Sequence, residues 1–304
     1  MSRRLLVDRR ALAALTFPQL AARYPHHARL LLWLRACWLL RREQLHALGW
    51  PDPSTRQNRN QGLRRLTVAE LVEPIDEQGR VYKLGRRGAS VLQAYGLIAP
   101  YRATPRSRAQ PGLLIASEFA VALGLALMKH RHVLAMNWSE APFAGTVVRP
   151  DASGMLRYSV RPGPECRRLD LLRPEPSWPP AAGEYTIRLF LEVDRATQFA
   201  EKIEERVRSW AAAFQTPAYA ELPANTVQLV LWVTAGTWQR VHTIRQIWSE
   251  YTGQVAAFTT CYQLRGERDD GPMAPLQAVW SDQDGSGLYG SDLFVLALNA
   301  TVAS

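Results

Sequence analysis

Three carboxylates in the second half of the sequence have the types and spacing of a site for a divalent cation. Asp151 follows Pro150 where a short strand is expected to end, and Glu192 and Asp194 close the stretch Tyr185–Asp194. Side chains alternate between the two faces of a strand, so Glu192 and Asp194 share one face. Carboxylate oxygens suit Mg²⁺ or Mn²⁺, and a cation held there would activate water for phosphodiester cleavage. The spacing therefore predicts a magnesium (or manganese) site formed by Asp151, Glu192 and Asp194.

Lys202 completes the predicted catalytic set with Asp151 and Glu192. It lies on an expected helix, Thr197–Phe214, at the edge of the apolar stripe. From there its ammonium group would lean over the sheet and stabilise charge in the transition state. A structural interpretation also fits, in which the carboxylates only end a strand or turn and Lys202 is an exposed partner of Glu201 or Glu205.

A helix in the first half has the pattern of a DNA-reading helix. It is expected to begin at Ser54, because Ser54 and Gln57 form a capping box. At 100° per residue, Leu63 and Leu66 mark its buried face. Amide and guanidinium groups on the opposite side pair with adenine and guanine edges in the major groove. The predicted DNA-contacting residues of this helix are Gln57, Asn58, Gln61, Arg64 and Arg65.

This helix belongs to an expected N-terminal arrangement of three helices, a hairpin and a closing helix. The two preceding helices are Pro25–Leu40 and Arg42–Leu48, and the closing helix is Arg86–Tyr95. Between them, Leu71–Leu84 reads as a hairpin in which Gly79 supplies the positive φ of the turn. This is the order of a winged helix-turn-helix, whose wing would bring to DNA phosphates Arg80, Lys83, Arg86 and Arg87. A winged helix used for protein contact or dimerisation is the open alternative.

Helices alternate with buried strands in the remainder of the chain, which predicts an α/β domain with a mixed sheet. The near-continuous apolar run Val227–Thr234 is typical of a strand buried on both faces. The other expected strands are Val133–Asn137, Thr146–Arg149, Leu156–Val160, Tyr185–Asp194 and Val255–Tyr262, and the expected helices are Leu113–Lys129, Thr197–Phe214 and Trp238–Tyr251. Arg161–Gly183 and Gly271–Gly290 are expected to be irregular.

Charge and cysteine content narrow the functional class. Residues 1–110 hold 20 of the 37 Lys and Arg residues but only 7 of the 27 Asp and Glu residues, so the net charge of +10 is concentrated there. Such a field attracts polyanions, which favours double-stranded DNA as the partner. The three cysteines form no Cys-x-x-Cys pair, and no apolar run is long enough for a clear membrane span, so we expect a cytoplasmic protein without a membrane partner.

The motifs of the second half resemble a known nuclease superfamily. Pro150-Asp151, then Glu192-Val193-Asp194-Arg195-Ala196-Thr197, then Lys202, are similar to the PD-(D/E)xK pattern. More closely, a winged helix followed by "PDA" and "LEVDRATQFAEKI" resembles the plasmid replication-relaxation family over roughly residues 24–262. The resemblance implies a DNA-binding protein of plasmids or other mobile elements, with a restriction-endonuclease-like second domain.

The chain departs from the superfamily pattern at one position. The superfamily places its lysine two residues after the glutamate, and this chain has Asp194 at that position. In some branches of the superfamily the lysine is displaced onto the next helix, and here Lys202 would take that role. Glu118 matches a helix position where some superfamily members carry an extra acid. The resemblance therefore adds Glu118 as a further, weakly supported candidate for a metal ligand.

We therefore expect an α/β protein with a winged helix-turn-helix at 1–96, a basic proline-rich linker at 97–111 and a nuclease-like domain at 112–304. Two functions compete. One is a metal-dependent DNA nuclease or nickase targeted by the winged helix. The other is a non-catalytic DNA-binding regulator of replication or transcription, with other replication or mobile-element proteins as further candidate partners. The sequence does not indicate the oligomeric state.

Overall fold

The computed structural model divides the chain into two compact units, Met1–Ser117 and Glu118–Ser304. The predicted linker, 97–111, falls within the first unit by this division. The structure describes residues 12, 14–49, 56–97, 101–107, 110–127, 130–139, 148–161, 182–222, 225–266, 273–282, 284–289, 293–294 and 298.

The first unit contains the predicted three helices, hairpin and closing helix, with an additional helix and a short strand. Its helices are α2 (Phe17–Arg23), α3 (Pro25–Ala36), α4 (Arg42–Gly49), α5 (Arg56–Val68) and α6 (Arg86–Ala94), and its strands are β1 (Leu40–Arg41), β2 (Val72–Pro74) and β3 (Val81–Leu84). The strands form an antiparallel sheet in the order β1-β3-β2. Ser54, the predicted cap of α5, lies outside the described residues.

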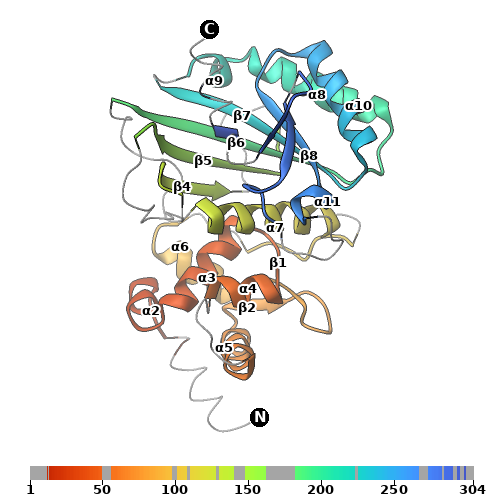
Figure 1. Ribbon diagram of the computed structural model, residues 1–304. Coiled ribbons are helices and arrows are strands. Elements are labelled where there is room, and N and C mark those ends of the chain that lie inside the picture. The colour runs from red at the N-terminus through yellow and green to blue at the C-terminus, as the bar shows by residue number, and fades with distance from the viewer. Residues whose placement is uncertain are drawn as a thin grey trace. The chain divides into compact units, whose positions relative to one another are not determined.

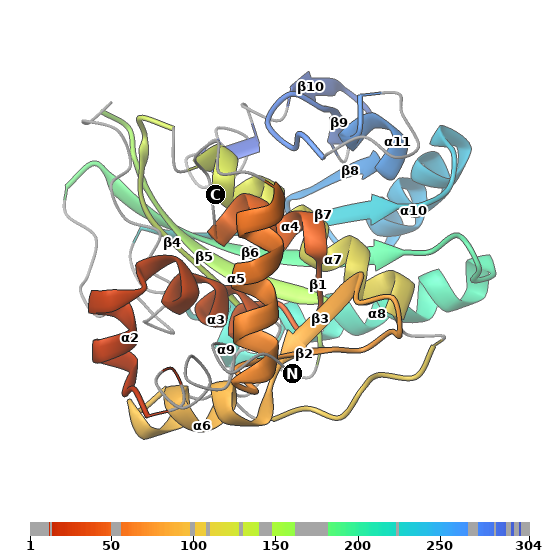
Figure 2. The ribbon, with the colours of Figure 1, turned by 90° about the horizontal axis from the view of Figure 1, so that it is seen from below.

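Two features at the start of the first unit differ from the prediction. Helix α3 ends at Ala36, not at Leu40, because Leu40 pairs with Tyr82 in the sheet. Helix α2 was not predicted, although Thr16 and Gln19 form a capping box at its start. Phe17 of α2 packs against Tyr95, with ring centroids 5.1 Å apart, and Figure 2 shows α2 close to α6.

The turn between β2 and β3 is fixed by polar contacts. Gly79 has φ +56°, the left-handed conformation that the sequence predicts there. The carboxylate of Asp76 accepts hydrogen bonds from the backbone amides of Arg80 and Val81, at 2.8 and 2.9 Å. Arg42, at the start of α4, donates to the carbonyl oxygens of Gln78 and Gly79. The hairpin is therefore tied to the helical part of the unit.

The second unit contains a seven-stranded mixed sheet in the order β10-β9-β8-β7-β6-β5-β4 (Figure 2). β4 to β6 form an antiparallel meander, β6 to β8 are parallel, and β9 and β10 are antiparallel. The strands are β4 (Val133–Ser139), β5 (Ala152–Ser159), β6 (Glu184–Asp194), β7 (Thr226–Thr234), β8 (Ala256–Thr260), β9 (Val279–Asp282) and β10 (Gly287–Tyr289). The predicted mixed sheet is confirmed.

The parallel strands are connected by helices that pack on one face of the sheet (Figure 1). The helices of this unit are α8 (Ala200–Phe214), α9 (Pro217–Ala220), α10 (Trp238–Tyr251) and α11 (Cys261–Leu264), with most of α7 (Gln110–Leu127). Trp210 of α8 and Trp248 of α10 are fully buried in one core cluster with Phe190 of β6 and Trp232 of β7. This core fixes the side chains of β6 that face α8 and α10.

Several strand predictions need correction. β9 and β10 lie within the predicted irregular stretch Gly271–Gly290, where short pairing at a sheet edge leaves little sequence signal. Of the predicted strand Thr146–Arg149, the described residues Val148 and Arg149 are outside any strand. The predicted strand Leu156–Val160 is longer and begins at Ala152.

Helix α7 is the one described helix with the length and mean hydropathy, 1.5, of a membrane span. Its Phe119 is buried and contacts Trp138 and Trp280 of the sheet, with ring centroids 6.3 and 6.0 Å apart. Its Glu118 forms an ion pair with Arg265 at 3.0 Å. These contacts give α7 the character of a core helix.

We predict that Gly88→Ala destabilises the first unit. A Cβ at this position would lie 2.2 Å from the carbonyl oxygen of Leu71, a backbone atom that cannot move aside cheaply. The free energy of unfolding should fall by about 1–3 kcal/mol, the usual cost of overpacking. Urea denaturation measures the loss. Ser90→Ala, at an exposed position of α6, is the control and should change stability by less than about 0.5 kcal/mol. Equal stability of both variants would contradict this packing.

Candidate nucleic-acid interface and carboxylate site

The exposed side of α5 is polar, as helical geometry predicts. Leu63 and Leu66 are buried. On the other side, the exposed residues are Gln57, Asn58, Gln61 and Arg64, and Arg65 is partly exposed. This exposure is what a DNA-reading helix requires, whereas the contact with DNA stays a prediction.

The basic residues near the hairpin do not all remain accessible. Arg86 and Arg87, in the first turn of α6, are exposed. Arg80 is exposed over 69% of its side chain and pairs with Asp76 at 3.5 Å. These three residues fit the predicted contact with phosphates.

Lys83 is a correction to the predicted phosphate contacts, because only 2% of its side chain is exposed. Its ammonium group donates to the Tyr101 hydroxyl and the Arg102 carbonyl oxygen at 3.2 and 2.9 Å, and lies 3.3 Å from a carboxylate oxygen of Glu73. Tyr101 in turn donates to Glu73 at 2.8 Å. Lys83 therefore holds the segment after α6 against β2 and β3, and part of the predicted solvated linker is packed.

The second unit places Asp151 beside the end of β6. The backbone amide of Asp151 donates to the Leu191 carbonyl oxygen at 2.9 Å, and its carboxylate accepts from the Val193 amide at 2.8 Å. The antiparallel register of β5 and β6 is what brings Asp151 close to Glu192. Burial raises the pKa of Asp151, against the opposing effects of the Val193 hydrogen bond and of Arg206.

Glu192 is buried and both of its carboxylate oxygens are bound by side chains of α8. Arg206 donates to the two oxygens, at 3.0 Å from Nε and 2.6 Å from Nη2. Trp210 donates from its indole nitrogen at 2.8 Å. Arg206 also donates to the carbonyl oxygen of Arg149. The guanidinium group thus occupies the side of the carboxylate on which a cation would have to bind.

The electrostatics of Glu192 are dominated by burial. Loss of hydration raises its pKa to about 7, the guanidinium of Arg206 opposes this rise, and the nearby Asp151 adds to it. Ion pairing with Glu192 holds the pKa of Arg206 above its ordinary value, although burial alone acts in the opposite direction. Arg206 therefore serves as the fixed positive partner of a buried carboxyl group.

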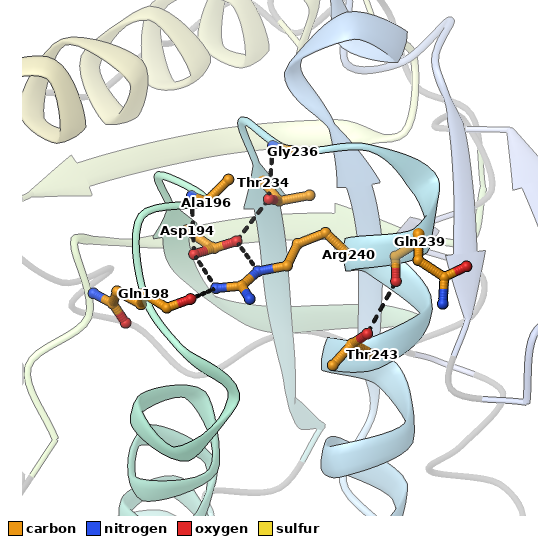
Figure 3. A network of polar contacts seen from close by, with 8 residues as sticks. All are labelled: Asp194, Ala196, Gln198, Thr234, Gly236, Gln239, Arg240 and Thr243. Carbon is orange, nitrogen blue, oxygen red and sulfur yellow. Dashed lines mark hydrogen bonds and ion pairs between the residues drawn. The ribbon is translucent and has the colours of Figure 1, made fainter.

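Asp194 shares a sheet face with Glu192, as alternation predicts, but it belongs to a separate network (Figure 3). Arg240 of α10 donates to both carboxylate oxygens, at 2.9 and 3.1 Å, and Thr234 donates at 2.7 Å. Although burial opposes ionisation, these contacts hold the pKa of Asp194 below its ordinary value. Arg240 also donates to the Gln198 carbonyl oxygen at 2.6 Å, so the network fastens the loop after β6 to α10.

Lys202 and Glu118 each pair with a residue other than these carboxylates. Lys202 is exposed over 67% of its side chain and binds Glu205 at 2.5 Å, so it does not lean toward the sheet as predicted. Phe199, which lies within the predicted helix Thr197–Phe214, is the cap residue of α8 and is 80% exposed. The stripe therefore begins at Ile203. Glu118 is engaged with Arg265.

The residue that sequence reasoning missed is Arg206. It stands four residues before the buried Trp210, so it lies beside Trp210 on the side of α8 that faces the sheet. That spacing is a usable signal, but the expectation of a lysine drew attention to Lys202. Arg240 was missed because its partner, Asp194, is distant in sequence.

The donors present do not fit a divalent cation. Among the described residues, no group of three or more Asp, Glu, His or Cys side chains is arranged to hold a metal ion. Glu192 is covered by Arg206 and Trp210, and Asp194 is covered by Arg240 and Thr234. The structure therefore does not bring Asp151, Glu192 and Asp194 together in the predicted Mg²⁺ or Mn²⁺ site.

Comparison with known proteins assigns the chain to a family. The family model described as replication-relaxation matches residues 31–230, well over half of the sequence. The chain belongs to the replication-relaxation family. The match runs from α3 to the middle of β7 and includes both units, so the family spans the polar face of α5 as well as Asp151, Glu192 and Asp194.

Other comparisons add little to the family assignment. Among curated proteins, none matches the chain. Among solved structures, the restriction endonuclease FokI bound to DNA is similar at 13% identity, with a TM-score of 0.27. The similarity covers 80% of this chain and 44% of the FokI chain. A TM-score of this size does not establish a shared fold.

We predict that Arg206→Ala destabilises the protein in a pH-dependent way. Without the guanidinium, the folded-state pKa of Glu192 should rise further above the value of about 4.3 that an unfolded chain gives it. A raised folded-state pKa leaves stability intact below the unfolded pKa and removes it as the pH rises through the folded value. The free energy of unfolding should therefore fall by about 3 kcal/mol at pH 8 and by less at pH 5. Urea denaturation at the two pH values measures the difference.

Lys202→Ala is the matched control for this variant. It removes one cation from the same helix, but from an exposed pair with Glu205. Exposed pairs contribute little, so its effect on stability should be small and the same at both pH values. A loss in Arg206→Ala that does not depend on pH would show that the pair with Glu192 is not its origin.

Proposed function

We propose that the protein binds duplex DNA through its first unit and acts as a non-catalytic regulator of replication or transcription on a plasmid or other mobile element. The observation that carries the proposal is α5, which is buried along Leu63 and Leu66 and exposes amide and guanidinium side chains on the other side. Such groups pair with base edges in the major groove, which admits a helix. The proposed readers of bases are Gln57, Asn58, Gln61 and Arg64.

The charge and shape of the first unit support the same proposal. The excess of Lys and Arg over Asp and Glu lies in residues 1–110. The order of helices and hairpin agrees with a winged helix-turn-helix, with Arg80, Arg86 and Arg87 exposed near the hairpin. Contacts with phosphates position a protein on DNA without reading its sequence. We assign these three arginines to that role and leave Lys83 out of it.

The non-catalytic part of the proposal is supported by the arginine partners of the carboxylates. A hydrolytic metal site needs carboxylate oxygens directed at the cation, with open positions for water and substrate. Here Arg206 and Arg240 each bind two oxygens of one carboxylate. We infer that the second unit serves as a platform for DNA or for replication proteins of the cytoplasm, and the nuclease remains the alternative that experiment must test.

We predict that the full chain binds duplex DNA with a steep dependence on salt, because neutralised phosphates release counterions. Fluorescence anisotropy with duplexes selected from a random pool measures the affinity. Gln61→Ala and Asn58→Ala should each lower discrimination at a preferred site by about 1–3 kcal/mol. Arg86→Ala is the contrasting variant and should weaken binding to all duplexes alike. An affinity that stays constant from low to high salt would overturn the assignment of the first unit.

We predict that Mg²⁺ and Mn²⁺ neither raise the thermal stability of the wild-type protein nor support cleavage of supercoiled plasmid. A ligand that binds the folded state stabilises it by mass action, so calorimetry with and without metal tests for a site. Arg206→Ala is the positive control, because it leaves Asp151 and Glu192 close together without their cation. That variant should gain stability from Mn²⁺. Metal-dependent cleavage by the wild type that is lost in Glu192→Gln would establish the nuclease instead.

A further inference from the structure

A cleft of about 430 Å³ opens in the first unit beside the polar face of α5. One wall is the junction of α2 and α3, and the other wall is α5; Figure 2 shows α3 beside α5. The side chains that matter for its chemistry are Arg23, His26 and His27 on the first wall and Asn58, Gln61 and Arg65 on the second. The cleft is therefore continuous with the surface proposed to read bases.

The lining of the cleft is basic. Arg23, His26, His27 and Arg65 contribute to it, and none of the residues described as lining it is acidic. The electrostatic effect is visible at His27, whose pKa falls to about 4, first through burial and then through repulsion from His26 and Arg65. The burial part of this effect disfavours any charge, but the repulsion from His26 and Arg65 reflects a positive potential in the cleft, which favours an anion.

The backbone at the cleft adds to this preference. Helix α3 is 12 residues long and begins at Pro25, which lines the cleft with His26. The amino-terminal end of a helix carries a partial positive charge, which favours a phosphate even though Pro25 has no N–H and the His27 and Ala28 amides donate to the Tyr24 carbonyl oxygen. The Nδ1 atom of His26 is buried and has no hydrogen-bond partner among the described residues, so a polar atom remains to be satisfied at this wall.

We propose that this cleft binds a phosphate of the DNA backbone, next to the groove that α5 enters. The inference rests on the proposed function and deepens it. Arg23 and His26 contact the phosphate from the α2–α3 junction, and Arg65 contacts it from α5. Arg65 is then a positioning residue that holds the register of α5, whereas Gln61 and Asn58, at the edge of the cleft, face the bases. The α2–α3 junction thereby extends the DNA contact beyond α5 and the hairpin.

The test measures salt dependence with the full chain and duplexes of several sequences. Each phosphate contact contributes about 0.9 to the slope of log affinity against log salt. Arg23→Gln and Arg65→Gln should each reduce that slope by about 0.9 and weaken binding to every duplex about tenfold near 0.1 M salt. Arg65→Lys keeps the charge and should retain most of the slope. Gln61→Ala should change sequence preference and leave the slope in place.

Lys202→Gln is the charge-matched control, since it removes one positive charge from an exposed pair in the second unit. It should leave the slope unchanged. Thermal unfolding checks that each variant is folded; if Arg65→Gln is not, Arg23→Gln, at the exposed end of α2, still decides the question. If the wild type binds DNA and both arginine variants keep the wild-type salt slope, the proposed phosphate site in the cleft is wrong, but the proposed function stands. Loss of sequence preference in Arg65→Gln at constant slope would make Arg65 a reader of bases. Absence of duplex binding by the wild type would overturn both proposals.

Discussion

The burial of negative charge on strand β6 constrains the second unit more than any other feature. Glu192 and Asp194 face the helical layer, where a lone carboxylate is costly. Each is matched by an arginine from a different helix, Arg206 from α8 and Arg240 from α10. Because breaking a buried pair leaves an uncompensated charge, the two pairs also determine where the helices lie along the sheet.

The same pairs explain why the carboxylates do not form the expected metal site. A cation and a guanidinium compete for the same oxygen atoms, and the guanidinium is covalently attached to a packed helix. Arg206 also donates to the carbonyl oxygen of Arg149, and the fully buried Trp210 donates to the same carboxylate of Glu192. In the structure the partners of Glu192 and Asp194 are therefore arginines.

The two units divide the charge of the chain between them. The basic excess lies in residues 1–110, and the exposed arginines there include Arg23 at the end of α2, Arg64 on α5, and Arg86 and Arg87 at the start of α6. In the second unit, Arg206, Arg240 and Arg265 are used to neutralise buried or half-buried acids. The sequence composition counts every arginine alike, whether it is exposed to solvent or buried in an ion pair. Composition alone therefore does not distinguish the arginines that could bind DNA from those that neutralise acids inside the second unit.

The sequence by itself determined most of the elements and their buried faces, but not α2, β9 or β10. Local periodicity and turn chemistry are enough to predict the polar face of α5, the turn at Gly79 and the bounds of α10. They also predict that Glu192 and Asp194 share one face of β6. Only the tertiary structure decided which charges meet. Lys202 turns to Glu205, Lys83 is buried against Tyr101, and Arg206 and Arg240 reach the carboxylates of β6. Periodicity specifies the direction of a side chain relative to its own helix or strand, whereas an ion pair between distant segments depends on how those segments pack, which no local pattern encodes.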